Sequence, residues 1–121
     1  MYLMRAELKA RTQDVAGAKA DLETLRAKRM STNISVNITD PTAMIKFVID
    51  ERLREFALQG FRWFDMRRLS VDPIFVGTTY KHEALSETGN VIATFPLKPE
   101  RFTLRIPQKV LLANPGMNDN P

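Results

Sequence analysis

The chain has 121 residues, 44% of them hydrophobic and 26% charged, with a net charge of +4, one histidine and no cysteine. This length and composition are typical of one ordinary globular domain. The lack of cysteine excludes disulfides, thiol catalysis and cysteine zinc sites, and a single histidine, His82, excludes a histidine-rich metal centre. No run of about 18 apolar residues could span a membrane, and Arg5 and Glu7 interrupt any apolar signal sequence at the start.

The basic residues do not form an unbalanced cluster. Eleven of the eighteen are arginines, and many of them lie beside carboxylates. A nucleic-acid-binding face more often shows basic residues without acidic neighbours. We therefore expect no nucleic-acid partner. A small basic nucleic-acid binder is the alternative, and it would show a steep dependence of binding on salt.

The first thirty residues predict a helical hairpin. Residues 1 to about 12 carry apolar side chains on one helical face, namely Leu3, Ala6 and Ala10. Asp14 is a good N-cap for a second helix to about Lys28, whose apolar face consists of Val15, Ala18, Leu22 and Leu25. Because only one or two residues join the helices, they should be antiparallel. Hairpins of this size are the repeat unit of TPR-type solenoids.

A second helix pair is predicted over residues 40–69. After a polar loop at 31–39, Asp40 and Pro41 supply a cap and a first helical residue. The helix should run to about Gln59, with an apolar stripe of Ile45, Val48, Ile49, Leu53 and Phe56. Gly60 suits the left-handed conformation that closes a helix. A short helix should follow from Phe61 to Leu69, with Phe61, Phe64 and Leu69 on its apolar side.

The stretch 51–69 combines charged and aromatic side chains at spacings that allow contacts on a helix. Asp50 and Arg54 should pair, as should Asp65 with its flanking arginines. We interpret the stretch as a nearly buried corner held by a structural network of Glu51, Arg52, Glu55, Gly60, Arg62, Trp63, Asp65 and Arg68. Glu51 and Glu55 could instead form an acid/base pair for glycoside hydrolysis. Their position one turn apart beside arginines favours the structural interpretation, and we expect no catalytic or metal site.

Residues 70–121 hold six of the seven prolines and lose helical periodicity. Tyr80–Leu85 and Val91–Phe95 flank a turn-forming Ser-Glu-Thr-Gly-Asn and could form a β-hairpin. We expect an extended segment at Phe102–Ile106, a helical turn at Gln108–Ala113, a loop at 114–116, and an exposed end at 118–121 unless it is docked. Trp63 is interpreted as core, His82 as a solvated loop residue, and Tyr80 as the candidate for stacking on a ligand ring.

The sequence therefore predicts a mainly α fold. It contains a TPR-like helical hairpin (1–30), a second core helix pair (40–69) and a loop-rich tail (70–121). The tail could contain one short β-hairpin. All of it is expected to form one domain.

Three separated stretches resemble the C-terminal part of the SusD/RagB family of outer-membrane nutrient-binding lipoproteins of Bacteroidetes. The first is Tyr2–Arg11 with Ala20–Arg29, similar to the last TPR-like hairpin of the family. The second is Glu51–Arg68, which ends in Gln-Gly-x-Arg-Trp-Phe-Asp-Met-Arg-Arg and is similar to the hallmark helix pair. The third is Ile106-Pro-Gln followed by Asn114-Pro and Asn120-Pro121, similar to the terminal segment.

The resemblance implies a C-terminal scaffold of a cell-surface glycan-binding protein that works with a TonB-dependent, SusC-like transporter barrel. It implies no enzymatic activity, no cofactor and an outer-membrane location for the full-length protein. We expect this chain to be a fragment or shortened product of such a protein, without signal or lipid-attachment cysteine. A homodimer could then cover the helical face that is left bare. The alternative is a helical-hairpin module that binds a protein partner and no sugar.

Overall fold

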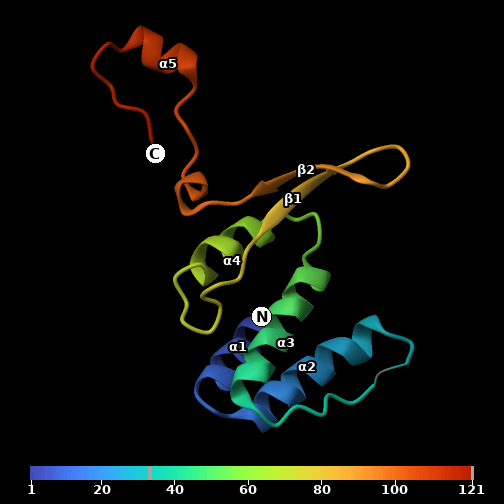
Figure 1. Cartoon of the computed structure of the whole chain (residues 1–121). Coiled ribbons are helices and arrows are strands. Elements are labelled where there is room, and N and C mark those ends of the chain that lie inside the picture. The colour runs from blue at the N-terminus through green and yellow to red at the C-terminus, as the bar shows by residue number, and fades with distance from the viewer. Residues whose placement is uncertain (33, 121) are drawn as a thin grey trace. The chain divides into compact units, whose positions relative to one another are not determined.

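The computed structural model describes residues 1–32 and 34–120 and divides into two compact units, Met1–Arg62 and the residues from Trp63 onward. The first unit contains helices α1 (Tyr2–Arg11), α2 (Val15–Arg29) and α3 (Pro41–Glu55), and helix α4 (Phe61–Leu69) begins at its end (Figure 1). Strands β1 (Lys81–Leu85) and β2 (Val91–Pro96), the 3₁₀ helix η1 (Pro99–Phe102) and helix α5 (Gln108–Ala113) follow. The predicted mainly α fold and its β-hairpin are confirmed.

The turn between α1 and α2 is fixed by Asp14 and its neighbours. The Asp14 carboxylate accepts a hydrogen bond of 2.8 Å from the Gly17 amide and so caps α2 as predicted. A Cβ atom on Gly17 would lie 2.1 Å from an oxygen of that carboxylate, so a side chain there would displace the cap. Gln13 adopts a left-handed φ of 67°, which reverses the chain within the few residues available.

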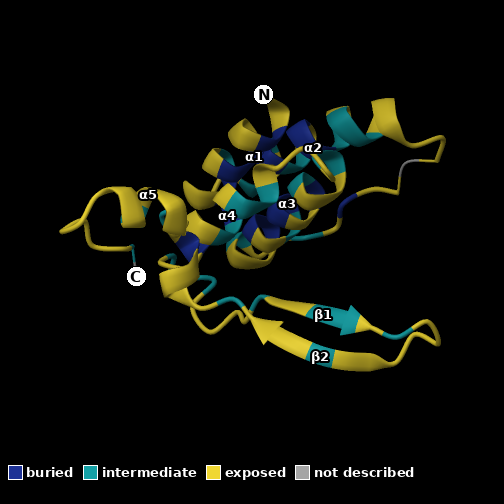
Figure 2. Cartoon of the chain, turned by 90° about the horizontal axis from the view of Figure 1, so that it is seen from above, coloured by how far each residue is buried: buried dark blue, intermediate teal, exposed yellow. Residues whose placement is uncertain are grey.

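Small side chains allow the helices of the first unit to pack closely. Helix α1 contacts both α2 and α3. Ala6, Ala10 and Ala18 are completely buried, and alanine at a contact position lets two helix backbones approach. Larger apolar side chains fill the remaining space, namely Leu3, Leu22, Val36, Met44, Ile45, Val48 and Ile49. Figure 2 shows the buried positions gathered on these helices, whereas the β-hairpin is exposed or half-buried.

The segment before α3 is anchored to α2 by one carboxylate. Glu23 accepts hydrogen bonds of 3.0 Å from the Val36 amide and 2.9 Å from the Ser35 hydroxyl, and these bonds lower its pKa below the ordinary value. The anchored Val36 places its side chain in the core. Asp40 then caps α3 by accepting from the Ala43 amide at 2.6 Å, as the Asp-Pro signal predicts. The loop prediction at 31–39 includes Asn33, which lies outside the described residues.

Helix α3 is shorter than predicted. It ends at Glu55 with Phe56 as C-cap, not at Gln59, and residues 56–59 form a turn in which the Gln59 amide donates to the Phe56 carbonyl at 3.2 Å. Leu58 has a left-handed φ of 63° in addition to the +80° of Gly60. The chain needs two left-handed residues to leave α3 and enter α4. Gly60 therefore has the predicted conformation but precedes α4 instead of closing α3.

Two predicted apolar stripes are partly wrong. Leu53 on α3 is 41% exposed, and on α4 Phe61 and Phe64 are 47% and 66% exposed. The buried residues of α4 are Asp65 and Leu69, four positions apart. Because Asp65 and Leu69 form the buried face of α4, Phe64 lies on the exposed face.

The β-hairpin pairs as an antiparallel sheet with a tight turn. His82 lies opposite Phe95 and Glu83 opposite Thr94, and the register is irregular between Ala84 and Leu85. The turn closes through the Gly89 amide, which donates to the Ser86 carbonyl at 2.9 Å, with Gly89 at a φ of +81°. Beyond the strands the Leu97 amide donates to the Tyr80 carbonyl at 2.7 Å, which places Tyr80 beside Leu97.

The last segment folds back on itself. The predicted extended segment at 102–106 is wrong at its start, because Phe102 ends η1, and residues 103–106 have no regular secondary structure. Helix α5 lies where a helical turn was predicted. Asp119 accepts from the Ile106 amide at 3.0 Å, and the Asn120 side chain donates to the Leu104 carbonyl at 2.7 Å, so the end is docked. Pro121, part of the family-like terminal motif, lies outside the described residues.

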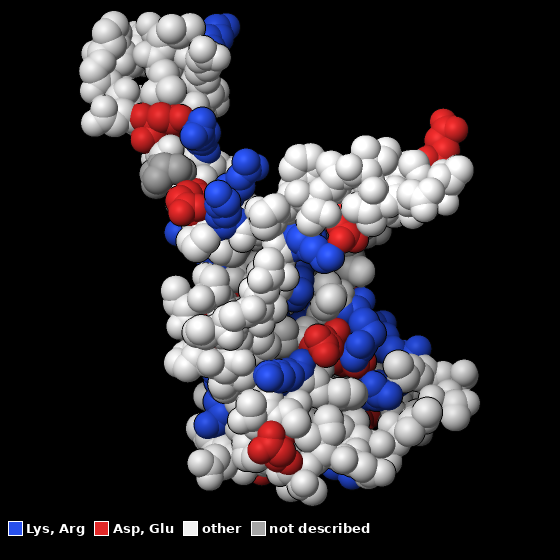
Figure 3. Space-filling view, viewed as in Figure 1, with Lys and Arg blue, Asp and Glu red and all other residues white. Residues whose placement is uncertain are grey.

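Charged side chains stabilise each unit by pairing. Figure 3 shows basic and acidic groups interspersed on the face it presents. Asp21 is buried on α2, and its Oδ2 atom accepts from Arg5 Nε at 2.8 Å and lies 3.0 Å from Lys9 Nζ. The hydrogen bond from Arg5 is the main reason that the pKa of Asp21 lies below its ordinary value. This carboxylate joins two residues of α1 to α2.

We predict that Asp21→Asn lowers the free energy of unfolding by about 1.5–3 kcal/mol, the contribution of hydrogen bonds to a charged group. Because the folded-state pKa of Asp21 is depressed, its contribution is present above the unfolded pKa of about 3.9 and is lost as pH falls through the folded value. Urea unfolding at several pH values should therefore show a weaker loss of stability in acid for D21N. Asp50→Asn, an exposed aspartate on α3, is the control, and equal acid sensitivity of D21N and the parent would contradict the assignment.

The left-handed residues of the α3–α4 turn allow a second prediction, which concerns stability. Gly60→Ala should lower the free energy of unfolding by about 1 kcal/mol, because a side chain disfavours the left-handed conformation even though no atom lies within 4 Å of the new Cβ. Leu58→Gly should not destabilise, since Leu58 is fully exposed and already strained. Thermal unfolding of both variants tests the turn geometry. A destabilising L58G and a neutral G60A would show that the turn is different.

Candidate functional site

The predicted network residues of α3 are paired with arginines of α2. Glu51 is buried and accepts from Arg26 Nη1 at 3.2 Å and from Arg54 Nη2 at 2.9 Å. Glu55 lies one turn further along and accepts from Arg29 Nη2 at 2.7 Å. The prediction that Arg54 pairs with Asp50 is wrong, because Arg54 pairs with Glu51 instead. Arg26 and Arg29 were not among the predicted residues, because their sequence distance of about 25 residues from the glutamates gives no local signal.

Aromatic rings cover the arginines of this network. The guanidinium carbon of Arg26 lies 5.6 Å from the centre of the Phe47 ring, and that of Arg52 lies 5.5 Å from the centre of the Phe56 ring. Such contacts stabilise a cation that is partly removed from water. The two glutamates are held by hydrogen bonds to cations and line no described cavity. The geometry is therefore that of a connection between two helices.

Among the predicted network residues of α4, Asp65 is a second buried carboxylate. Asp65 is 5% exposed and accepts from Arg68 Nε at 2.9 Å. Arg62 and Trp63 are half-buried. The structural role of these residues stays a prediction. Trp63 was predicted to be a core residue, but it lines two cavities.

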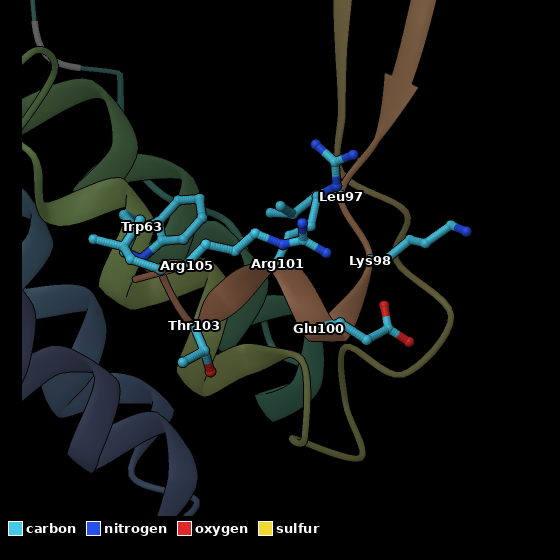
Figure 4. Close-up of a pocket in the computed structure, with 8 residues that line it drawn as sticks. Trp63, Leu97, Lys98, Glu100, Arg101, Thr103 and Arg105 are labelled. Carbon is cyan, nitrogen blue, oxygen red and sulfur yellow. The ribbon is translucent and has the colours of Figure 1, made fainter. Parts of the chain in front are cut away.

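The first cavity, which we call the Trp63 hollow, has a volume of about 620 Å³. Trp63 of α4 forms one side, and the remaining residues come from the segment around η1 (Figure 4). The Trp63 ring meets the buried Phe102 ring edge-on, with centres 5.7 Å apart, which holds α4 against η1. The other lining residues are Leu97, Lys98, Glu100, Arg101, Thr103, Leu104 and Arg105.

The second cavity, the Tyr80 hollow, has a volume of about 400 Å³ and adjoins the first, since Trp63, Leu97 and Arg101 line both. It contains Tyr80, the candidate ligand residue, together with Met66, Lys81, His82, Phe95 and Pro96. The predicted loop residue His82 lies in β1 and stacks on Phe95, with ring centres 6.4 Å apart. The hairpin thus places Tyr80 and Phe95 in one cavity with Trp63.

Sequence reasoning missed the basic residues of the Trp63 hollow. Lys98, Arg101 and Arg105 follow one another within a few residues, but the ring that faces them comes from α4, more than thirty residues earlier. No periodicity links these segments. Among residues 1–32 and 34–120, no group of three His, Cys, Asp or Glu side chains is placed to hold a metal ion, and none of the helices described there is long and apolar enough to span a bilayer.

The burial of Glu51 predicts that its substitution is more destabilising than the same substitution of Glu55, which serves as the control. Glu51→Gln removes a buried charge from between Arg26 and Arg54 and should lower the free energy of unfolding by about 3 kcal/mol or more. Glu55→Gln removes a pair whose arginine is 63% exposed, and it should cost about 1 kcal/mol or less. Urea unfolding of both variants measures the difference. Equal losses would mean that burial of Glu51 does not set the strength of its pairs.

The comparisons with known proteins agree with these motifs. A sequence model described as the SusD family matches residues 1–121. No match is found among curated proteins or among solved structures. Members of the family are nutrient-binding proteins associated with the outer membrane, not enzymes. Because the match extends over all of the sequence and includes the Glu51–Arg68 helix pair, this chain belongs to the SusD family.

Proposed function

We propose that this chain is the C-terminal scaffold part of a cell-surface glycan-binding protein that works with a TonB-dependent outer-membrane transporter. The observation that carries the proposal is the family match over residues 1–121. The family-like motifs have the order of the C-terminal part of these proteins, from the helical hairpin to the terminal segment. Residues 1–30, 40–69 and 70–121 then form successive parts of one SusD-like region.

The first unit supports a scaffold role. Its carboxylates are paired across helices, with Asp21 joining α1 to α2 and Glu51 joining α2 to α3. Networks that join several helices make a rigid frame when every member is satisfied, and among the described residues no buried side-chain polar atom lacks a hydrogen-bond partner. A rigid frame suits a protein that holds a ligand without changing it chemically.

The proposed partnership predicts that a TonB-dependent barrel binds this chain. The purified chain, with an affinity tag in the exposed β1–β2 turn, is added to a detergent extract of outer membranes from its source organism. Mass spectrometry should identify a TonB-dependent barrel among the retained proteins, in amounts comparable to the chain. The same resin without the chain is the control. Recovery of the chain with no barrel would contradict the partnership.

An exposed apolar surface favours a second candidate, a helical module that binds a protein and no sugar. On α1 Met4 and Leu8, one turn apart, are 66% and 63% exposed, and Tyr2 is 43% exposed. Adjacent exposed apolar residues are common at protein interfaces. If this candidate is right, Met4→Gln with Leu8→Gln abolishes binding of the partner and no saccharide binds. Saccharide binding that survives the double substitution would argue against it.

A further inference from the structure

The Trp63 hollow has an excess of positive charge. Lys98, Arg101 and Arg105 line it against a single carboxylate, that of Glu100, which leaves an excess of two positive charges. Within the part of the chain that the structure describes, the Lys98 and Arg101 side chains form no hydrogen bond or ion pair. Arg105 lies 3.8 Å from Asp119, a long contact in which its side chain is 79% exposed. These cations are therefore available to a ligand.

The hollow contains one aromatic ring and several charged side chains, with Arg105 beside Trp63 and with Lys98 and Glu100 farther from the ring. In Figure 4 the Trp63 ring lies at one side, and the Lys98 and Glu100 side chains extend on the opposite side of the η1 backbone. Trp63 is half-buried and is oriented by its edge-on contact with Phe102. A ring held in this way can offer a face to a ligand at little cost in conformational freedom.

The chemistry of this surface fits one class of ligand. The electron-rich face of an indole attracts the C–H groups on one face of a sugar ring, which carry partial positive charge. A guanidinium binds planar or tetrahedral acid groups through two parallel N–H donors. A volume of about 620 Å³ lies within the ordinary range of ligand cavities. A ligand with both a sugar ring and an acid group would use both the Trp63 ring and the cationic side chains of the hollow.

We propose that the Trp63 hollow binds an anionic saccharide, a sugar that carries a carboxylate or a sulfate, with Trp63 stacking on the sugar ring and Arg101 pairing with the acid group. The inference rests on the proposed glycan-binding function and names the class of glycan. Lys98 and Arg105 add to the positive potential, and Glu100 opposes it. The Tyr80 hollow shares Trp63 and Arg101 and offers Tyr80 and Phe95 to the next sugar of the chain.

A titration with matched oligosaccharides tests this proposal. The probes are a tetrasaccharide of galacturonic acid, its full methyl ester, and a sulfated galactose tetrasaccharide. Trp63 is the only tryptophan, so its fluorescence reports directly on the hollow, and calorimetry measures the affinity independently. We expect saturable binding of the acid or of the sulfated sugar, binding of the methyl ester at least about tenfold weaker, and loss of affinity with added salt.

Substitutions of opposite sign make the test specific. Arg101→Gln should weaken binding of the acidic sugar about tenfold and leave the weak binding of the methyl ester unchanged. Glu100→Gln should strengthen acid binding about twofold to threefold, because it removes a like charge from the ligand site. Arg67→Gln, an exposed arginine of α4 outside the Trp63 hollow, is the control and should change nothing. All three positions are exposed, and unchanged melting curves would show that the fold is intact.

Each contrary result has its own meaning. Equal affinity for the acid and its methyl ester, or an R101Q affinity within twofold of the parent, would overturn the anionic preference and leave the proposed glycan-binding function standing. A lack of binding to all three probes would overturn this inference as a whole. The proposed function would then be decided by capture of the TonB-dependent barrel, which does not depend on a saccharide.

Discussion

A carboxylate removed from water needs a partner, and in this protein the partners of Glu51 come from two helices. Arg26 of α2 and Arg54 of α3 both donate to one of its oxygens. The Coulomb attraction and the hydrogen bonds must offset the cost of removing the charges from water. Since that compensation fails if α2 moves away from α3, the pair fixes how these helices lie together. The buried alanines of α1 and α2 and the Asp21 pairs add α1 to the same frame.

The predictable parts of this fold are those with local causes. Asp14 and Asp40 cap the helices that follow them, and the Ser-Glu-Thr-Gly-Asn turn forms its hairpin, because each signal acts within a few residues. The end of α3 was not predictable, since leucine rarely adopts the left-handed conformation of Leu58. Periodicity alone also placed Phe64 on the buried side of α4, where Asp65 and Leu69 lie instead.

The candidate site depends on contacts between distant segments, so the sequence indicated only its separate parts. Tyr80 was a candidate because it lies in an irregular region, and the hairpin places it in a hollow with Trp63. Trp63 was expected in the core, since three phenylalanines lie near it in the sequence. In the structure the Trp63 ring packs edge-on against Phe102 and also lines two cavities. The basic residues around η1 had no sequence signal that related them to that ring.

The central claim is that an ion-paired helical frame is the stable part of this protein, while the hairpin and the η1 segment supply the ligand surface. Amide hydrogen exchange followed residue by residue tests this claim most directly. The account predicts the slowest exchange in α2 and α3 around Arg26 and Glu51, and much faster exchange in residues 81–96 and 103–120. Exchange in α2 and α3 as fast as in the β-hairpin would contradict it.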